Sequence, residues 1–136
     1  MAAKNRKVIL VVDDEADFAL IVKKNLQKKG FNIDIAYDGT QALEKIRSDP
    51  PCAVILDMIM PEKSGKEVCA ELKNDSRLRS IPVILLSSVP GTVGSTRFST
   101  LPKNVMGADD YLPKPASVEE IIQCLEKLAG PFDKTL

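Results

Sequence analysis

The sequence predicts an α/β protein with a doubly wound, five-stranded parallel sheet. Short apolar runs rich in β-branched residues alternate with longer segments whose apolar residues recur at helical spacing, and Gly, Pro and Asp residues separate them. This alternation favours parallel strands joined by right-handed helical crossovers, with helices on both faces of the sheet. With five strands, the expected arrangement is the flavodoxin-like order 2-1-3-4-5.

The five strands are expected in short segments that are almost entirely apolar. The first, KVILVV, has no polar residue after its lysine, which is typical of a strand buried on both faces. The third ends at Asp57, and the fifth is the shortest. The expected strands are 7–12, 31–36, 53–56, 82–86 and 110–112.

Four helices are expected, and most have a recognisable start or stop. The first carries Phe18, Ile21, Val22 and Leu26 at helical spacing, which indicates a core-facing side, and it stops at Gly30. The expected helices are 14–29 and 40–47, then 66–74 and finally 118–128, with Asp38 and Ser117 as N-caps of the second and last.

One segment breaks the alternation. Residues 87–104 are rich in Pro, Gly, Ser and Thr where another helix is due between the fourth and fifth strands. These residue types favour turns and caps over helix interiors. We therefore expect an irregular or shortened fourth helix, mostly a loop, with at most a short helical turn near 95–101.

Length and composition indicate one domain, residues 1–136, with a core of about 7–128. Lys and Arg total 19 and so do Asp and Glu, so no bulk attraction to nucleic acid or to an anionic membrane is expected. The first residues lead straight into a strand, and no apolar run is long enough for a membrane span, which favours a cytoplasmic protein without a signal peptide.

Residue types missing from the chain exclude several kinds of chemistry. The sequence has no histidine, which rules out Ser-His-Asp and Cys-His catalysis, His-ligated zinc, and a role as the histidine partner in phosphoryl transfer. Its three cysteines are widely spaced and form no CxxC motif, so a disulfide framework or zinc site is not expected. Any chemistry depends on carboxylates, lysine, hydroxyls or a bound metal.

Polar side chains follow four of the expected strands. Asp13 and Asp14 follow the first strand, Asp57 ends the third, Ser87 follows the fourth and Lys114 follows the fifth. Ligands of open parallel sheets bind beyond the carboxyl ends of the strands, where the strand order reverses. Neighbouring strands lie about 4.8 Å apart, so the carboxylates are expected on adjacent strand ends.

Three carboxylates so close together repel one another, so either one of them stays protonated or a cation offsets them. Mg²⁺ suits a few carboxylates together with waters and a phosphate oxygen. Asp57 can then attack phosphorus and form an aspartyl phosphate. The metal and Lys114 would offset charge on the transferring group, and Ser87 would donate a hydrogen bond to it.

Four motifs in this order resemble the response-regulator receiver domain of two-component signal transduction. They are VVDDE at 11–15, LDMIMPEKSG at 56–65, VILLSS at 83–88 and GADDYLPKP at 107–115. The resemblance extends over roughly residues 7–128. It implies a phosphoprotein that takes a phosphoryl group from a sensor histidine kinase or phosphotransfer protein and then controls a downstream protein.

The resemblance also implies the roles of individual residues. Asp57 corresponds to the phosphorylation site. Asp14 and Asp57 correspond to direct ligands of Mg²⁺, together with the carbonyl of Ile59, while Asp13 acts through water. Such a receiver catalyses its own phosphorylation and is not a turnover enzyme on an external substrate.

The remaining positions implied by the resemblance concern the phosphoryl group and the switch. Ser87 stands at the switch hydroxyl, and Tyr111 at the aromatic position whose ring moves inward on activation. Lys114 corresponds to the lysine that contacts the phosphoryl group, with a cis bond to Pro115.

Three features depart from the family pattern. The unusual 88–104 segment belongs to the family's output surface, which puts the usual partner mode in doubt. The residues two past Asp57 and Ser87 are Ile59 and Val89, and neither orients an attacking water, so we hypothesise slow self-dephosphorylation. The chain ends at Leu136 with no effector domain expected, and it is either a stand-alone regulator or a module of a larger protein.

Two other functions are alternatives to a phosphorylated receiver. A degenerate receiver that acts only as a protein-interaction module fits the unusual 88–104 segment, although the acidic residues and Lys114 argue against it. A phosphohydrolase with an aspartyl-phosphate intermediate needs a second acid two residues after its nucleophile, and that position is Ile59.

Overall fold

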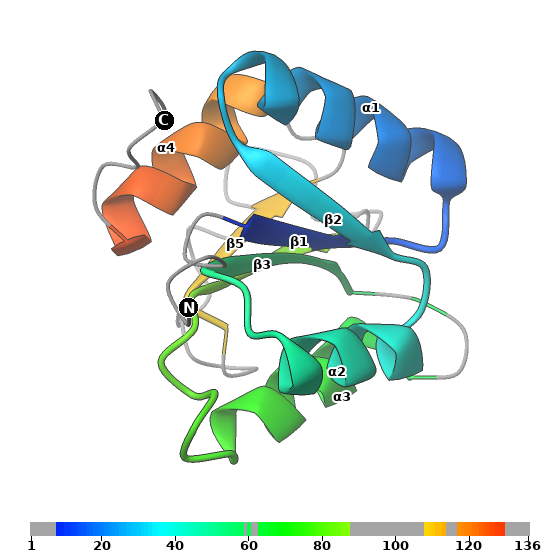
Figure 1. Ribbon diagram of the computed structural model, residues 1–136, viewed down its shortest axis with the longest axis vertical. Helices are drawn as coiled ribbons and strands as arrows, with labels where there is room; N and C mark the ends of the chain where they lie inside the picture. Colours follow the sequence, from blue (N-terminus) through cyan, green and yellow to red (C-terminus); the bar gives the residue numbers. More distant parts are fainter. Residues whose placement is uncertain (1–7, 59, 61–62, 88–107, 114–116, 130–136) are drawn as a thin grey trace.

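The five predicted strands form one parallel sheet. The computed structural model describes residues 8–58, 60, 63–87, 108–113 and 117–129. Its strands lie in the order β2-β1-β3-β4-β5, which confirms the predicted fold class and strand order (Figure 1). They are β1 (Val8–Val12), β2 (Asn32–Ala36), β3 (Ala53–Asp57), β4 (Val83–Ser87) and β5 (Asp110–Pro113).

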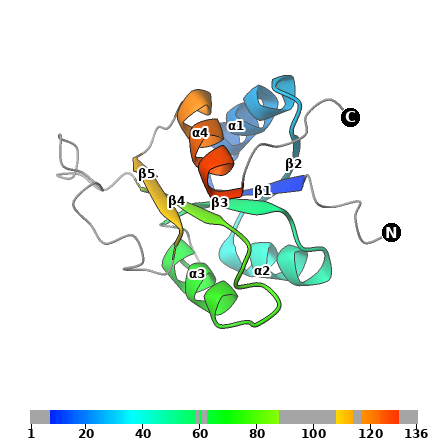
Figure 2. The ribbon, with the colours of Figure 1, turned by 90° about the vertical axis from the view of Figure 1, so that its left-hand side faces the viewer.

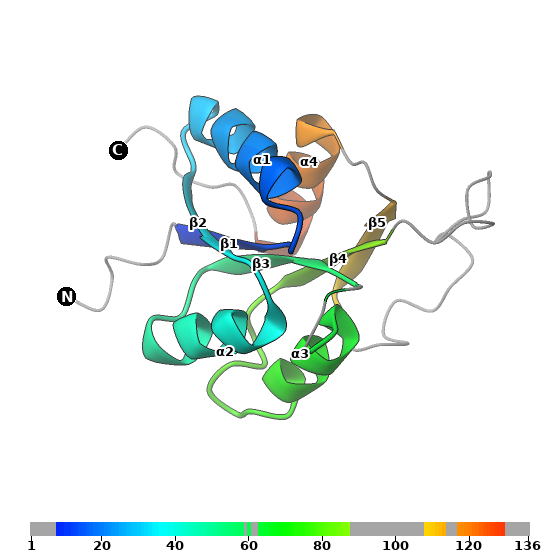
Figure 3. The same cartoon turned by 90° about the vertical axis from the view of Figure 1, so that its right-hand side faces the viewer.

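Helices cover both faces of the sheet. The views along the sheet in Figures 2 and 3 place α1 and α4 on one face, and α2 and α3 on the other. They are α1 (Ala16–Lys28), α2 (Gly39–Ser48), α3 (Gly65–Lys73) and α4 (Val118–Ala129). Among the described residues, no helix combines the length and the apolar character that crossing a bilayer requires. Residues 88–104, where an irregular helix was expected, lie outside the described residues.

The two faces of the sheet have separate apolar cores. Every residue of β3 is buried, and successive side chains of this strand enter opposite cores. Val54 and Leu56 join the core beneath α2 and α3, whereas Ala53 and Ile55 join the core beneath α1 and α4. The continuous apolar run in the sequence therefore reflects a strand covered on both sides.

The prediction that Ile21 belongs to the core was wrong. Its side chain is 57% exposed, whereas Ala19, Val22 and Leu26 are buried. Ile21 is adjacent to Val22 in sequence, which places it about 100° around the helix. Both residues fit a helical spacing, and only packing on the sheet decides which one faces inward.

The ends of the elements follow the predicted capping chemistry. Gly30 follows α1 with a φ of 97°, a left-handed conformation that favours glycine. The Phe31 amide donates to the Leu26 carbonyl at 3.1 Å and so closes the end of this helix. Asp38 accepts from the Gln41 amide at 2.7 Å, which confirms it as the cap of α2.

A clamp around Lys73 fixes the amino ends of β4 and β5. The Lys73 ammonium, at the end of α3, donates to the Ile81 carbonyl at 3.0 Å and to the Asp109 carboxylate at 2.9 Å. The same Asp109 oxygen accepts from the Val83 amide at 2.8 Å. The clamp thus joins α3, β4 and β5 at the amino ends of the strands. The polar residues of the predicted site lie at the carboxyl ends, on the opposite side of the sheet.

Candidate functional site

The carboxyl ends of β1 and β3 bring the acidic residues together. Val12 lies opposite Leu56 in the strand register, so the next residues, Asp13 and Asp57, also fall opposite each other. The Asp13 amide donates to the Ala36 carbonyl of β2 at 3.1 Å. The ladder thus extends one residue past β1 and fixes the backbone of Asp13.

Three carboxylates converge at this edge. One oxygen each from Asp13, Asp14 and Asp57 lies within 4.8 Å of the others. Asp13 is 1% exposed and Asp57 is 5% exposed, while Asp14 lies at the surface. Asp13 also accepts from the Glu15 amide at 2.9 Å, which orients its carboxylate at the start of α1. The cluster is therefore largely buried and reaches the surface at Asp14.

The electrostatics of this cluster favour a small, hard cation. Two like charges about 4 Å apart repel by about 1–4 kcal/mol, depending on how well solvent screens them. Mg²⁺ holds its oxygen ligands about 2.1 Å away in an octahedron, which places the ligand oxygens about 3–4 Å apart. The observed spacing of the carboxylates is close to this range, so the residues present fit Mg²⁺.

Gly65 permits α3 to begin directly against the backbone of Asp57. A Cβ at position 65 would overlap the Asp57 carbonyl oxygen and lie 2.9 Å from the Asp57 carbonyl carbon. The Gly65 amide donates to the Met58 carbonyl at 2.9 Å, which closes the loop after β3. Asp57 is therefore held from the strand side by the sheet and from the loop side by the start of α3.

A capping box fixes the start of α3. The Glu67 amide donates to the Ser64 hydroxyl at 3.2 Å, and the Ser64 amide donates to the Glu67 carboxylate at 2.9 Å. The S-x-x-E pattern of residues 64–67 is the local sequence signal of this cap. The close approach of Gly65 has no such local signal, because it involves a backbone eight residues away.

Of the other predicted site residues, the structure describes Ser87 and Tyr111. Ser87 ends β4 opposite Pro113, one residue beyond the pair formed by Leu86 and Asp57. Tyr111 is 6% exposed and packs in the core beneath α2 and α3. Two further predicted residues, Ile59 and Lys114, lie outside the described residues.

The cysteines are free thiols that are not part of the acidic cluster. Burial raises the pKa of both Cys52 and Cys69 to about 11, so both stay protonated near neutral pH. A protonated thiol is a poor nucleophile and a poor metal ligand. The carboxylates therefore remain the candidate ligands of this site.

Residues 9–126 match the sequence model of a protein family, the response regulator receiver domain. A curated relative, the response regulator MprA of Mycobacterium ulcerans, is 38% identical over 120 residues. That alignment covers 88% of this chain and 49% of the relative. The chain thus spans about half the length of the curated relatives it matches.

Solved receiver structures share the fold. The receiver domain of the Francisella response regulator 1452 superposes with a TM-score of 0.77 at 29% identity, covering 90% of this chain and 96% of that one. The response regulator TrrA of Thermotoga maritima, solved in complex with Mg²⁺ and BeF, superposes with a TM-score of 0.72 at 34% identity. This second alignment covers 90% of this chain and 98% of TrrA.

Replacement of Gly65 by alanine is expected to disturb Asp57 and not only the stability of the fold. The added methyl group forces the start of α3 away from the Asp57 backbone, at a cost of about 1–3 kcal/mol in the free energy of unfolding. Displacement of a ligand's support lowers metal affinity about 10- to 100-fold. Urea unfolding and calorimetric Mg²⁺ titration measure the two effects.

Gly30→Ala is the matched control for Gly65→Ala. Its positive φ makes alanine cost about 1–2 kcal/mol, but position 30 follows α1 and does not touch Asp57. The control should lose stability and keep the affinity of the parent for Mg²⁺. Equal loss of affinity in both variants would contradict the role assigned to Gly65.

Asp13→Asn is expected to stabilise the metal-free protein and to reduce the stabilisation that Mg²⁺ provides. In the metal-free protein the substitution removes repulsion and keeps an oxygen for the Glu15 amide, so the free energy of unfolding should rise by about 1 kcal/mol or more. The extra stability that Mg²⁺ gives the parent should shrink. Urea unfolding in EDTA and in excess Mg²⁺ measures both, with Asp75→Asn as a distant control. A lower metal-free stability than the parent's would argue against repulsion.

Proposed function

This chain belongs to the response-regulator receiver family, and on that basis we propose that Asp57 accepts a phosphoryl group from a phosphohistidine on a partner protein. The observation that carries the proposal is the convergence of the Asp13, Asp14 and Asp57 carboxylates at the switch point of the sheet. Receivers are signalling modules, and the product here is the phosphorylated protein itself.

Mg²⁺ is the cofactor that this cluster fits best. Asp14 and Asp57 would bind it directly with the carbonyl of Ile59, and Asp13 would act through water. When bound, Mg²⁺ offsets the charge of the carboxylates and of the phosphoryl oxygens. The proposal is supported by the buried positions of Asp13 and Asp57, because carboxylates screened poorly by solvent bind a cation with less competition from water.

The transfer is a displacement at phosphorus. A carboxylate oxygen of Asp57 forms the new O–P bond while the N–P bond of the phosphohistidine breaks, and the released imidazole takes up a proton. The start of α3 and the ladder from β3 to β4 hold the backbone of Asp57, so its carboxylate keeps one orientation toward an incoming donor. Lys114 would offset charge on the transferring group.

Phosphorylation is proposed to shift the protein between two conformations. The new phosphoryl oxygens would accept a hydrogen bond from Ser87 at the end of β4 and draw that strand end toward Asp57. Tyr111 lies on β5 beside Leu85 of β4, so a movement of β4 reaches the ring through the sheet. The partners proposed are a sensor histidine kinase or phosphotransfer protein and a downstream protein, without direct contact of this domain with nucleic acid or membrane.

Intact mass after incubation with Mg²⁺ and acetyl phosphate tests the acceptor. The parent should gain the mass of one phosphoryl group, and the gain should disappear in EDTA and in Asp57→Ala. Asp75→Asn, which changes a carboxylate far from the cluster, should behave as the parent does. No gain in a parent that binds Mg²⁺ would favour an interaction-only receiver.

The phosphorylated parent is expected to lose its phosphoryl group slowly. Ile59 and Val89, two residues past Asp57 and Ser87, are apolar and offer no hydrogen bond to an attacking water. Ile59→Gln supplies such a group and should shorten the lifetime, by about 10-fold if it acts as a positioning residue. Mass spectrometry of the purified phosphoprotein over time measures both rates. A parent that decays as fast as Ile59→Gln would refute this role.

A further inference from the structure

The β2 strand is an edge of the sheet with outward-facing amides. Among the strands of the described structure, β2 pairs with β1 alone. The Ala36 carbonyl accepts from the Asp13 amide, so the backbone groups of Ala36 face β1. Backbone groups of successive residues in a strand face opposite sides, and the amides of Ile33, Ile35 and Tyr37 therefore face away from the sheet. An edge of this kind is a template for pairing with another strand.

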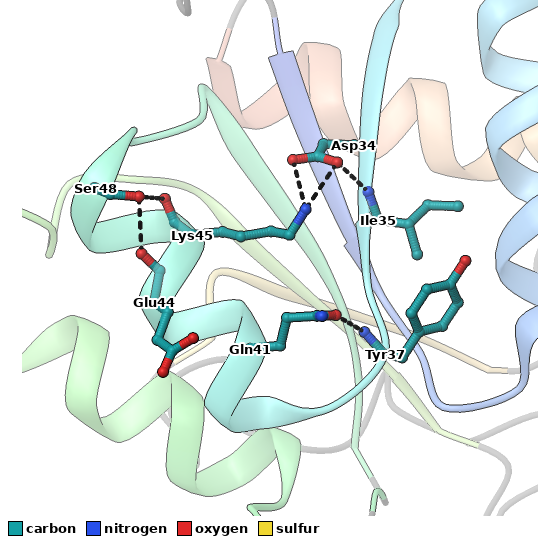
Figure 4. A network of polar contacts seen from close by, with 7 residues as sticks. All are labelled: Asp34, Ile35, Tyr37, Gln41, Glu44, Lys45 and Ser48. Carbon is teal, nitrogen blue, oxygen red and sulfur yellow. Dashed lines mark hydrogen bonds and ion pairs between the residues drawn. The ribbon is translucent and has the colours of Figure 1, made fainter.

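Asp34 accepts a hydrogen bond from one of these amides, that of Ile35. The Ile35 amide donates to Oδ1 of Asp34 at 2.9 Å, as Figure 4 shows. The Lys45 ammonium, reaching across from α2, lies 3.2 Å from each oxygen of the same carboxylate. The ion pair holds the Asp34 side chain beside its own strand, where it accepts the hydrogen bond that another strand would otherwise accept.

Gln41 accepts a hydrogen bond from a second outward-facing amide, that of Tyr37. The Tyr37 amide donates to Oε1 of Gln41 at 2.7 Å (Figure 4). Gln41 is the third residue of α2, a position whose side chain usually reaches back to the amide of the N-cap residue. Here the N-cap is Asp38, and the Gln41 side chain reaches one residue further, to Tyr37. The first turn of α2 therefore extends the protection of the edge beyond the end of β2.

We propose that Asp34 and Gln41 close the carboxyl-terminal half of the β2 edge against strand pairing, and that the strand they exclude is β2 of a second copy of this chain. Two copies related by a two-fold axis present the same row of amides and carbonyls to each other, which suits antiparallel pairing. The sequence NIDIA contains no proline and has two isoleucines, which favour such pairing. Asp34 adds a charge that opposes its own copy.

The proposal is tested by opening the edge. In Asp34→Thr/Gln41→Ala both amides are released and the charge is removed, while the buried cores keep their residues. Each backbone hydrogen bond gained between copies strengthens association about 2- to 10-fold, so self-association should tighten by about 10-fold or more over the parent. Sedimentation velocity across a range of protein concentrations measures this change.

The matched control removes a comparable contact away from the edge. Arg47→Ala/Glu71→Ala breaks an exposed ion pair of 3.0 Å between α2 and α3, together with the ion pair of Glu71 with Lys63, and leaves the β2 amides as they are. The control should associate no more than the parent does. Equal association of the parent and the edge variant, or equal gains in the edge and control variants, would overturn the proposal.

Amide hydrogen exchange tests the two contacts one at a time in dilute protein. In the parent, the Ile35 and Tyr37 amides should exchange more slowly than unstructured amides, although neither belongs to the ladder with β1. Asp34→Thr should accelerate exchange at Ile35 and leave Tyr37 unchanged, and Gln41→Ala should do the reverse. Exchange at unstructured rates in the parent would overturn the proposal even if the double variant failed to fold.

Discussion

Electrostatic repulsion at the carboxyl ends of β1 and β3 is the constraint on which the rest of the molecule depends. Folding brings Asp13, Asp14 and Asp57 within 4.8 Å of one another, an arrangement the chain would avoid without compensation. Burial of the apolar strands that carry them offsets part of this repulsion. Burial of one large aliphatic side chain contributes about 1.5–3 kcal/mol, comparable to the repulsion of one carboxylate pair, and β1 and β3 each bury several. The apolar sheet therefore holds together three carboxylates whose spacing suits a bound cation.

The two ends of the strands have different roles, one structural and one chemical. At the amino edge, the Lys73 clamp joins α3 to the starts of β4 and β5 through backbone carbonyls and Asp109. At the carboxyl ends of the strands, the carboxylates of Asp13, Asp14 and Asp57 converge. Helix α3 contributes to both, because its last residue forms the clamp and its first residue supports Asp57. A shift of α3 would therefore affect stability and the site together.

The sequence predicts the elements and the acidic cluster well, because both depend on local patterns. Periodicity distinguishes strands from helices, Gly30 and Asp38 mark helix ends, and strand ends in a parallel sheet must meet at one edge. Prediction fails where tertiary packing decides. Ile21 fits the helical spacing of the core as well as Val22 does, yet it faces outward. The contact of Gly65 with Asp57 depends on how tightly a helix approaches a strand, which no local pattern records.

The separation of the two cores has an evolutionary consequence. The backbone of the sheet lies between the apolar layer beneath α1 and α4 and the layer beneath α2 and α3, so a substitution in one layer is accommodated by neighbours in the same layer. Tyr111 belongs to one layer, and the next residue of β5, Leu112, packs against the other. The layers can consequently diverge at different rates in descendants of this chain. Selection on a partner that contacts α1 and α4 would leave the support of Asp57 by α3 intact.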